Sequence, residues 1–264
     1  MENKATIGIF GGSGFYSFLN DVKEVTVETP YGKTSDKIAI GKIADKSVAF
    51  MPRHGKEHSL TPEQVNYRAN IWAMKEIGCK YIISPCAAGS LQEFIKPGDI
   101  VFCDQFVDWT FGRRKDTFYE GPIITHVSAA DTYCPKLREI AINAAEKLNL
   151  SYHKKGTVVV INGPRFTTKA ESRFFTNQGF SVINMTQYPE SYLAKELDMC
   201  PLNISMITDF DAGLVSDTDP VSHSEVIKVF QSNIINLKKL LLQIITDFEE
   251  YDCECHKTSS KSRA

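Results

Sequence analysis

This sequence lacks several features, and each absence excludes a class of protein. The 264 residues contain no apolar run that approaches the roughly 18 residues of a membrane-spanning helix, and no positively charged, long apolar N-terminal segment. The formal net charge is −2, so no basic excess argues for nucleic acid. No Pro/Gly/Ser-rich linker and no internal repeat is present. We therefore expect a cytoplasmic protein of one domain, with neither nucleic acid nor a membrane as partner.

Regular cysteine spacing is also missing, although there are seven cysteines. Those in apolar stretches are typical of reduced core residues: Cys79, Cys103 and Cys200. The exception is Cys253-Glu254-Cys255-His256, whose side chains could bind a metal. Because this motif lies beside a polar end, a disordered segment without function is the favoured interpretation. We predict that residues 251–264 form a disordered C-terminal tail and that the protein has no metal site.

Short apolar runs alternate along the chain with helical patterns. Strands are expected at residues 6–10, 38–43, 47–51, 81–85, 100–106, 156–161, 182–185 and 202–208. Helices are expected at residues 62–77, 134–148, 168–178, 188–197 and 222–248. The first of these helices is predicted to begin at Thr61 and Pro62, an N-cap followed by a proline at the first position. The alternation predicts an α/β fold, with a single domain over residues 1–250 and a mixed central β-sheet flanked by helices.

The most informative part of the sequence is the pair Asp209 and Asp211, which follows the apolar run 204–207. In an extended segment, a spacing of two residues points both side chains to the same face. Like charges so placed resist double ionisation, so one carboxyl is expected to hold a proton near neutral pH. A proton donor beside an acceptor suits a nitrogen heterocycle with an exocyclic amine, such as the N7 and N6 edge of adenine. A solvated turn or a helix N-cap is the alternative.

A glycine-rich turn, Gly11-Gly12-Ser13-Gly14, follows the first predicted strand. Its backbone N–H groups and the hydroxyl of Ser13 could converge on an anion. The glycines nearly match the dinucleotide-binding fingerprint, but residues 15–27 are too irregular for the helix that this fingerprint requires. A tight turn that needs a positive φ is the other interpretation.

A second polar motif, Arg53-His54-Gly55, follows the predicted strand 47–51, at a strand end where α/β sheets place ligands. The guanidinium of Arg53 suits bidentate binding of an oxyanion. Zinc is the competing interpretation, because His54 and His58 are four residues apart. That arrangement needs a helix, and the intervening glycine favours a loop.

Two more strand ends carry small or aromatic residues. The run Ser84-Pro85-Cys86-Ala87-Ala88-Gly89-Ser90 would let the backbone approach a ligand closely. Asn162-Gly163-Pro164-Arg165-Phe166 could present Phe166 as a wall on which a base stacks, although simple core packing would explain this aromatic residue equally well.

Taken together, these motifs resemble the trimeric purine nucleoside phosphorylase family. The motifs Gly-Gly-Ser-Gly, Arg-His-Gly, Ala-Ala-Gly-Ser, Gly-Pro-Arg-Phe with Ala170-Glu171-Ser172, Asn-Met-Thr with Pro189-Glu190, and Thr-Asp-Phe-Asp occur in the family's order over residues 5–248. Within the family, the sequence most closely resembles the methylthioadenosine phosphorylases. The resemblance implies a homotrimer that splits S-methyl-5'-thioadenosine with phosphate, giving adenine and 5-methylthioribose 1-phosphate for purine and methionine salvage. It implies no metal and no organic cofactor, since inorganic phosphate is a substrate.

The resemblance also implies a role for each matching position. Asp209 and Asp211 would be the catalytic residues: Asp209 would hydrogen-bond or protonate N7, and Asp211 would lie near the 6-amino group. An acid at N7 stabilises the leaving purine as the C1'–N9 bond breaks. Phosphate would be bound by Ser13, Arg53, His54, Cys86, Ala87 and Thr186. The nucleoside would contact Phe166 at the base, Met185 under the ribose and, at its 5' side, His126 from a neighbouring subunit.

A few positions bear on the choice of nucleoside. Family members that act on 6-oxopurines have Glu where Thr167 stands and Asn where Asp209 stands, so both residues favour 6-aminopurines. Cys86 replaces a Thr that is familiar in animal relatives, and a thiol is a weaker phosphate donor. His223 could donate to a 5'-hydroxyl, while Val226 could contact a methylthio group. The alternatives are a broader purine nucleoside phosphorylase acting on adenosine or inosine, a nucleosidase, and a non-catalytic nucleoside-binding protein.

Overall fold

The computed structural model describes residues 4–11, 20–122, 124–212, 214 and 223–262, and in residues 20, 223–228 and 230–232 it describes the backbone alone. Ser13 lies outside the described residues. His223 and Val226 lie on a described helix, but their side chains are outside the description.

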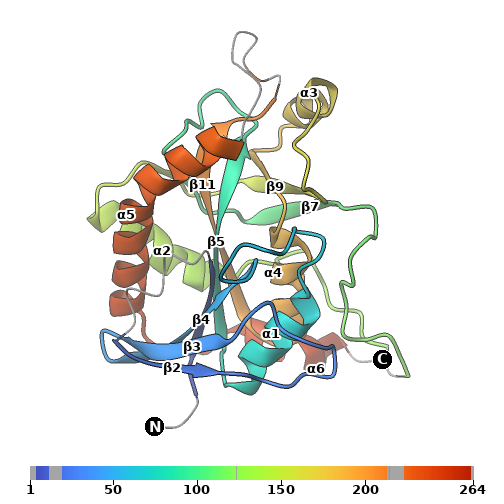
Figure 1. Cartoon of the computed structure of the whole chain (residues 1–264), viewed down its shortest axis with the longest axis vertical. Helices are drawn as coiled ribbons and strands as arrows, with labels where there is room; N and C mark the ends of the chain where they lie inside the picture. The colour runs from blue at the N-terminus through green and yellow to red at the C-terminus, as the bar shows by residue number, and fades with distance from the viewer. Residues whose placement is uncertain (1–3, 12–19, 123, 213, 215–222, 263–264) are drawn as a thin grey trace.

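A mixed β-sheet with eleven described strands forms the centre of the molecule (Figure 1). Eight strands follow the order β2-β3-β4-β1-β5-β10-β9-β7, while β11 pairs with β5 and β6, and β6 with β8. The strand bounds are β1 Ile7–Gly11, β2 Asn20–Val25, β3 Ile38–Ile43, β4 Lys46–Pro52, β5 Tyr81–Ser90, β6 Ile100–Val101, β7 Gln105–Trp109, β8 Tyr152–His153, β9 Thr157–Ile161, β10 Val182–Asn184 and β11 Cys200–Phe210. The predicted mixed sheet flanked by helices is therefore confirmed.

Helices cover both faces of the sheet because successive strand side chains point to opposite sides. Ile7 and Ile9 of β1 pack in the cluster that contains α2 and α5, while Phe10 packs in the cluster that contains α1 and α4. In Figure 1, α2 and α5 lie on one side of the strands and α1 and α4 on the other. The helix bounds are α1 Tyr67–Glu76, α2 Pro135–Lys147, α3 Lys169–Asn177, α4 Gln187–Glu196, α5 His223–Asp247, the 3-10 helix η2 Glu254–Lys257 and α6 Thr258–Ser262.

Several predicted boundaries need correction. Helix α1 begins at Tyr67 rather than near Pro62, because the side chain of Asn66 accepts the capping hydrogen bond from Ala69 N. The predicted strand 100–106 is interrupted between β6 and β7, and the strand predicted at 81–85 continues to Ser90. Strands β2 and β8 were not predicted.

The C-terminal segment differs most from its prediction. Instead of a disordered tail, residues 251–262 include η2 and α6 and pack against the domain. Cys255 and Ser259 are buried, and Ser259 donates to the carboxylate of Asp198 at 2.5 Å. The backbone N–H of His126 donates to Ser262 O at 3.2 Å. Burial and hydrogen bonds thus order this segment, which composition alone marked as unstructured.

Within the described residues, no helix is both long and apolar enough to cross a membrane.

Candidate active site

Strand β5 creates the place where the predicted motifs meet. Along one edge, residues 81–83 pair with β1 and residues 89–90 pair with β10, which runs antiparallel to β5. Along the other edge, β5 pairs with β11 over its length. Along the first edge, residues 84–88 therefore lie between the end of the β1 pairing and the start of the β10 pairing. Ligands commonly bind at such a position in α/β proteins, because not all backbone groups there are hydrogen-bonded within the sheet. We call residues 84–88 the β5 junction.

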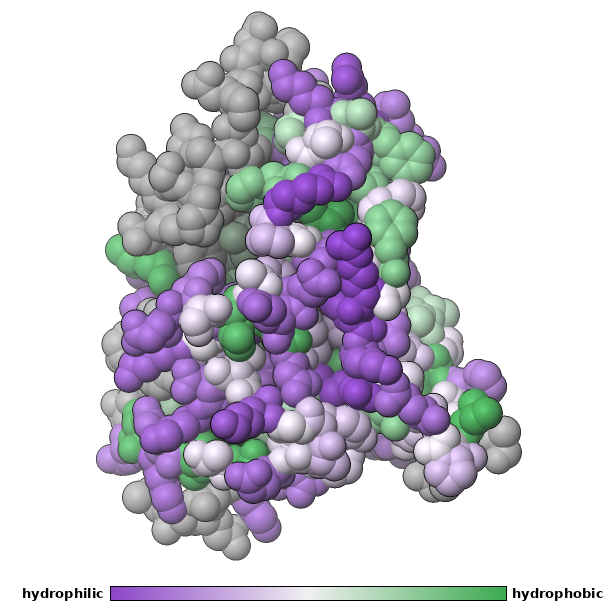
Figure 2. Space-filling view, turned by 45° about the vertical axis from the view of Figure 1, so that its right-hand side comes forward, coloured by the Kyte–Doolittle hydropathy of each residue, from purple (hydrophilic) through white to green (hydrophobic). Residues whose placement is uncertain are grey.

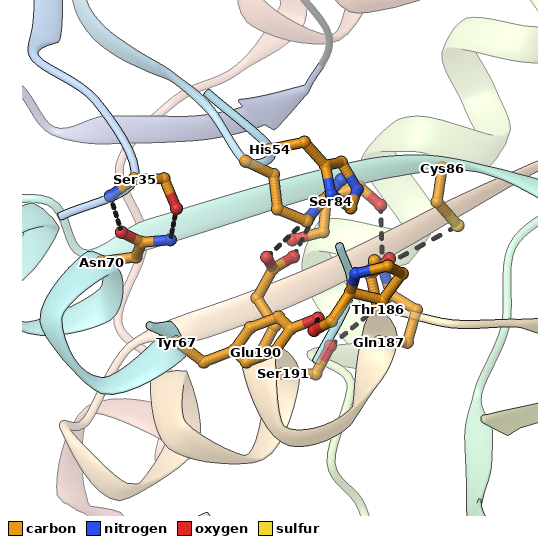
Figure 3. A network of polar contacts seen from close by, with 12 residues as sticks. Ser35, His54, Tyr67, Asn70, Ser84, Cys86, Thr186, Gln187, Glu190 and Ser191 are labelled. Carbon is orange, nitrogen blue, oxygen red and sulfur yellow. Dashed lines mark hydrogen bonds and ion pairs between the residues drawn. The ribbon is translucent and has the colours of Figure 1, made fainter. Parts of the chain in front are cut away.

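Arg53 reaches the β5 junction from the end of β4. Its guanidinium donates to both carboxylate oxygens of Glu190 in α4, at 2.6 and 2.8 Å, and to Pro85 O at 3.3 Å. The two side chains of this ion pair are 4% and 0% exposed. Figure 3 shows Glu190, Gln187 and Ser191 projecting from α4 towards β5. Glu190 was part of a recognised motif, but its pairing with Arg53 was not predicted, because the two residues are 137 positions apart.

His54 follows Arg53 and is held in one tautomer. Its Nδ1 lies 2.9 Å from Leu60 O, and a carbonyl can only accept, so Nδ1 carries the proton. Burial, followed by the charge of Arg53, lowers the pKa of His54 from 6.5 to about 4. At neutral pH the ring is therefore uncharged, and its Nε2 offers a lone pair rather than a proton. The ring of His58 is tilted by 38° from that of His54, with the ring centres 4.8 Å apart. His58 has a positive φ of 52° and lies in a turn rather than in a helix, as Gly55 indicated.

The segment after β10 approaches the β5 junction from the opposite direction. Asn184 places its Oδ1 3.3 Å from Thr186 N and 3.4 Å from Gln187 N, so it satisfies the first N–H groups of α4. Its Nδ2 donates to the sulfur of Cys86 at 3.2 Å. Thr186 is the N-cap of α4 but makes no side-chain cap bond, and it is buried. The antiparallel pairing of β10 with β5 thus brings Thr186 to the junction.

Cys86 and Ala87 lie inside β5 rather than in a loop. The sulfur of Cys86 also receives a hydrogen bond from Asn203 Nδ2 at 3.4 Å and lies 3.7 Å from Ser205 Oγ. Burial raises the pKa of this thiol, so it remains protonated. The Oγ of Ser84 is buried and has no hydrogen-bond partner among the described residues. Buried polar atoms of this kind commonly bind a ligand or an ordered water.

The two aspartates lie over Gly89, as their spacing predicts. Asp209 pairs with Gly89 across the sheet, next to a register shift between Ile207 and Asp209. A Cβ atom on Gly89 would lie 3.1 Å from Asp209 Oδ1 and 3.5 Å from the Cβ of Asp211. The glycine therefore leaves room for both carboxylates on one face. Thr208 Oγ1 donates to Asp209 Oδ2 at 2.7 Å.

Asp211 is the more buried of the pair. The hydroxyl of Thr167 lies 2.6 and 2.7 Å from its two oxygens. Burial raises the pKa of Asp211, against the effect of the Thr167 hydrogen bond. The main cause of the pKa rise at Asp211 is therefore burial, and not the charge of a neighbouring carboxylate.

Phe166 and Met185 flank the loop after β9. Both are half-buried. Gly163 has a φ of 69°, and a Cβ atom there would lie only 2.6 Å from the sulfur of Met185. A side chain at position 163 would therefore displace Met185. Asn162, in the same loop, has a buried Oδ1 without a hydrogen-bond partner among the described residues.

Arg114 connects these loops and was not predicted. It is buried, and its guanidinium donates to the carbonyl oxygens of Asn162 at 2.9 Å and Met185 at 2.8 Å, and also to that of Tyr188. Its carbon Cζ lies 5.2 Å from the ring centre of Tyr67. Arg114 lies in a polar loop without periodicity, so the sequence offered no signal for it.

His126 is exposed on the described chain and lies beside the C-terminal segment.

Near α3, the edge strand β7 carries Trp109, whose ring lies 5.4 Å from that of Phe111 and 5.6 Å from that of Phe174. Phe111 is 74% exposed and Phe174 is 45% exposed. Figure 2 shows hydrophobic side chains gathered near the top of the viewed face, above a largely hydrophilic surface. Exposed apolar groups of this size are typical of interaction surfaces.

Comparison with known proteins gives consistent results. The family model described as "Phosphorylase superfamily" matches residues 6–246. The chain is 51% identical to an S-methyl-5'-thioadenosine phosphorylase of Thermofilum pendens, over 96% of each protein. It is 45% identical to a purine nucleoside phosphorylase of Streptomyces coelicolor, over 96% of this chain and 93% of the relative. The solved structure of methylthioadenosine phosphorylase from Schistosoma mansoni in complex with adenine superimposes with a TM-score of 0.92 at 34% identity, covering 98% of this chain and 99% of that one.

Proposed function

Because this chain belongs to the phosphorylase superfamily, we propose that it catalyses phosphorolysis of S-methyl-5'-thioadenosine to adenine and 5-methylthioribose 1-phosphate. The observation that carries the proposal is that Arg53 and Thr186 lie at the β5 junction, while two aspartates lie over Gly89, the next residue of β5. The first group suits an anion and the second an aminopurine. The cytoplasmic location expected from the composition belongs to the same proposal.

In the phosphate half of the reaction, an oxygen of phosphate attacks C1' as the C1'–N9 bond breaks. Arg53 has donor N–H groups beyond those directed at Glu190 and Pro85, since a guanidinium carries five. Neutral His54 would accept a hydrogen bond at Nε2 from the P–OH group of a phosphate dianion. Ser13, Cys86, Ala87 and Thr186 complete the proposed phosphate site, with Cys86 acting through its backbone because its sulfur is already bonded to Asn184 and Asn203.

In the purine half, the leaving base gains negative charge, which an acid at N7 neutralises. We assign this role to Asp209. A carboxylate at Asp211, which already accepts from Thr167, suits an exocyclic N–H donor and would repel a 6-oxo group. Phe166 would stack on the base, and Met185 would lie under the ribose. No metal or organic cofactor enters this proposal.

The 5' side of the nucleoside is proposed to be closed by His126 from a neighbouring subunit, together with His223 and Val226. This requires the homotrimer implied by the family resemblance. The exposed aromatic group at Trp109, Phe111 and Phe174 supports an assembly, because association would bury it.

The decisive assay incubates the purified protein with methylthioadenosine, adenosine and inosine, each with and without inorganic phosphate, and quantifies free base and sugar phosphate. We expect base release only with phosphate, and a higher kcat/KM for the two 6-aminopurine nucleosides than for inosine. Equal release without phosphate would identify a nucleosidase. Preference for inosine would favour the broader purine nucleoside phosphorylase, the activity named for the Streptomyces coelicolor relative.

A further inference from the structure

A cluster of four cysteine side chains lies apart from the proposed active site. It joins three separate parts of the chain: the N-cap of α2, the first residue of β11, and the segment that leads into η2. All four sulfur atoms lie within 4.8 Å of one another: Cys134, Cys200, Cys253 and Cys255. The sulfurs of Cys134 and Cys253 are 3.6 Å apart, and none of the four cysteines is in a disulfide.

These separations suit a tetrahedral metal ion. A zinc–sulfur bond of about 2.3 Å places the sulfurs of a four-thiolate site about 3.8 Å from one another. Four thiolates in a tetrahedron are typical of zinc, because soft sulfur ligands and this geometry exclude the harder divalent cations. Cys253 and Cys255 flank a single residue, so one short segment would supply two of the ligands.

The surroundings of the cluster can hold thiolate charge. The N–H of Leu137 donates to the sulfur of Cys134 at 3.5 Å, at the positive end of α2. The hydroxyl of Tyr251 lies 3.4 Å from the same sulfur, and Lys136 Nζ lies 4.7 Å from the centre of the Tyr251 ring. Outer hydrogen bonds to the ligands are usual in metal sites, since they orient the ligands and spread their charge.

We propose that one zinc ion binds at this cluster, with four thiolate ligands: Cys134, Cys200, Cys253 and Cys255. The ion fastens the C-terminal segment to α2 and β11, in addition to the burial and hydrogen bonds that order this segment. Because Ser262 in that segment bonds to the backbone of His126, the ion also supports the part of the chain proposed to reach a neighbouring active site. The zinc site itself does not depend on the proposed reaction.

The test uses the full-length protein, purified with a thiol reductant and without chelator. Elemental analysis should find about one zinc ion per chain. Replacing zinc by cobalt should give the thiolate-to-cobalt charge-transfer bands and intense visible bands of a tetrahedral site. After chelator treatment, limited trypsin digestion at Lys257 and Lys261 should accelerate about tenfold or more, because the segment would no longer be fastened.

Two variants keep the proposal falsifiable. The double variant Cys253→Ser/Cys255→Ser should lose the metal and be cleaved equally fast with and without chelator. The control Cys79→Ala, which removes a buried thiol elsewhere, should retain zinc and the chelator effect. Reduced wild-type protein that contains no zinc and gives no cobalt bands would overturn the proposal. Disulfides among the four cysteines in freshly purified protein would overturn it as well.

Discussion

The buried ion pair between Arg53 and Glu190 allows a quantitative test, by the substitution Glu190→Gln. Glutamine keeps the shape of the side chain but removes its charge, so one of the two contacts at 2.6 and 2.8 Å would set an amide N–H against a guanidinium N–H. Removing one partner of a buried pair costs about 3–5 kcal/mol, because the remaining charge is left uncompensated. Whole domains are stable by only about 5–15 kcal/mol, so this is a large loss.

The measurement is the free energy of unfolding in urea, at one protein concentration for all variants because an oligomer's stability depends on concentration. The chain supplies a matched control: Arg165 and Glu171 form an equally close pair, at 2.8 and 2.7 Å, whose side chains are 65% and 32% exposed. Glu171→Gln should cost at most about 1 kcal/mol, since water already solvates both groups and glutamine preserves the capping box. A loss below about 1 kcal/mol for Glu190→Gln, or equal losses for the two variants, would refute the reasoning from burial.

Two further predictions concern single side chains at the site. The pKa of His54 is about 4 in the folded protein and near 6.5 in the unfolded chain. The preference for the neutral ring therefore favours the folded protein above pH 6.5, and this stabilisation is lost as the pH falls towards 4. Urea unfolding at several pH values should therefore show the wild type losing on the order of 3 kcal/mol more than His54→Asn across this interval, and parallel profiles would contradict the assignment. Thr167→Val removes the hydroxyl that donates to Asp211, so kcat/KM for adenine nucleosides should fall about tenfold or more, while Thr167→Ser should stay close to wild type. Equal kinetics for the valine and serine variants would show that this hydrogen bond does not matter.

Local signals explain which parts of the fold could be predicted. Helix α3 was located within a residue at each end because Thr168 and Glu171 form a capping box, which is encoded within four consecutive residues. Strand β3 was located correctly because it is a short, mostly apolar run in which every residue except Lys42 is buried. Strand β2 was missed because its sequence is largely polar and because it lies at the edge of the sheet, where it pairs with β3. The C-terminal segment was missed because its order comes from contacts with residues far away in the chain, such as Asp198.

In the candidate site too, local patterns were predicted and contacts between distant residues were not. One such contact changes the assignment of positive charge at the phosphate site. The sequence correctly predicted that Asp209 and Asp211 lie on one face, because that follows from local strand geometry. It assigned the positive charge at the phosphate site to Arg53, but the structure pairs Arg53 with Glu190, a partner that no local pattern reveals. Arg114 is buried as well, and within the described part of the chain its hydrogen bonds go to carbonyl oxygens and to a tyrosine hydroxyl rather than to a carboxylate.

Carbonyl dipoles compensate a guanidinium less completely than a carboxylate does, so the described hydrogen-bond partners of Arg114 neutralise its charge less than Glu190 neutralises that of Arg53. The effect of Arg114 already extends to His54, whose pKa is lowered mainly by burial and by Arg53, with a smaller contribution from Arg114. A phosphate dianion at the junction would therefore meet a guanidinium that, among the described residues, is hydrogen-bonded to neutral groups, in addition to one already paired with Glu190. The attraction for phosphate should thus depend on Arg114 as well as on Arg53, although nothing in the local sequence around Arg114 indicates it.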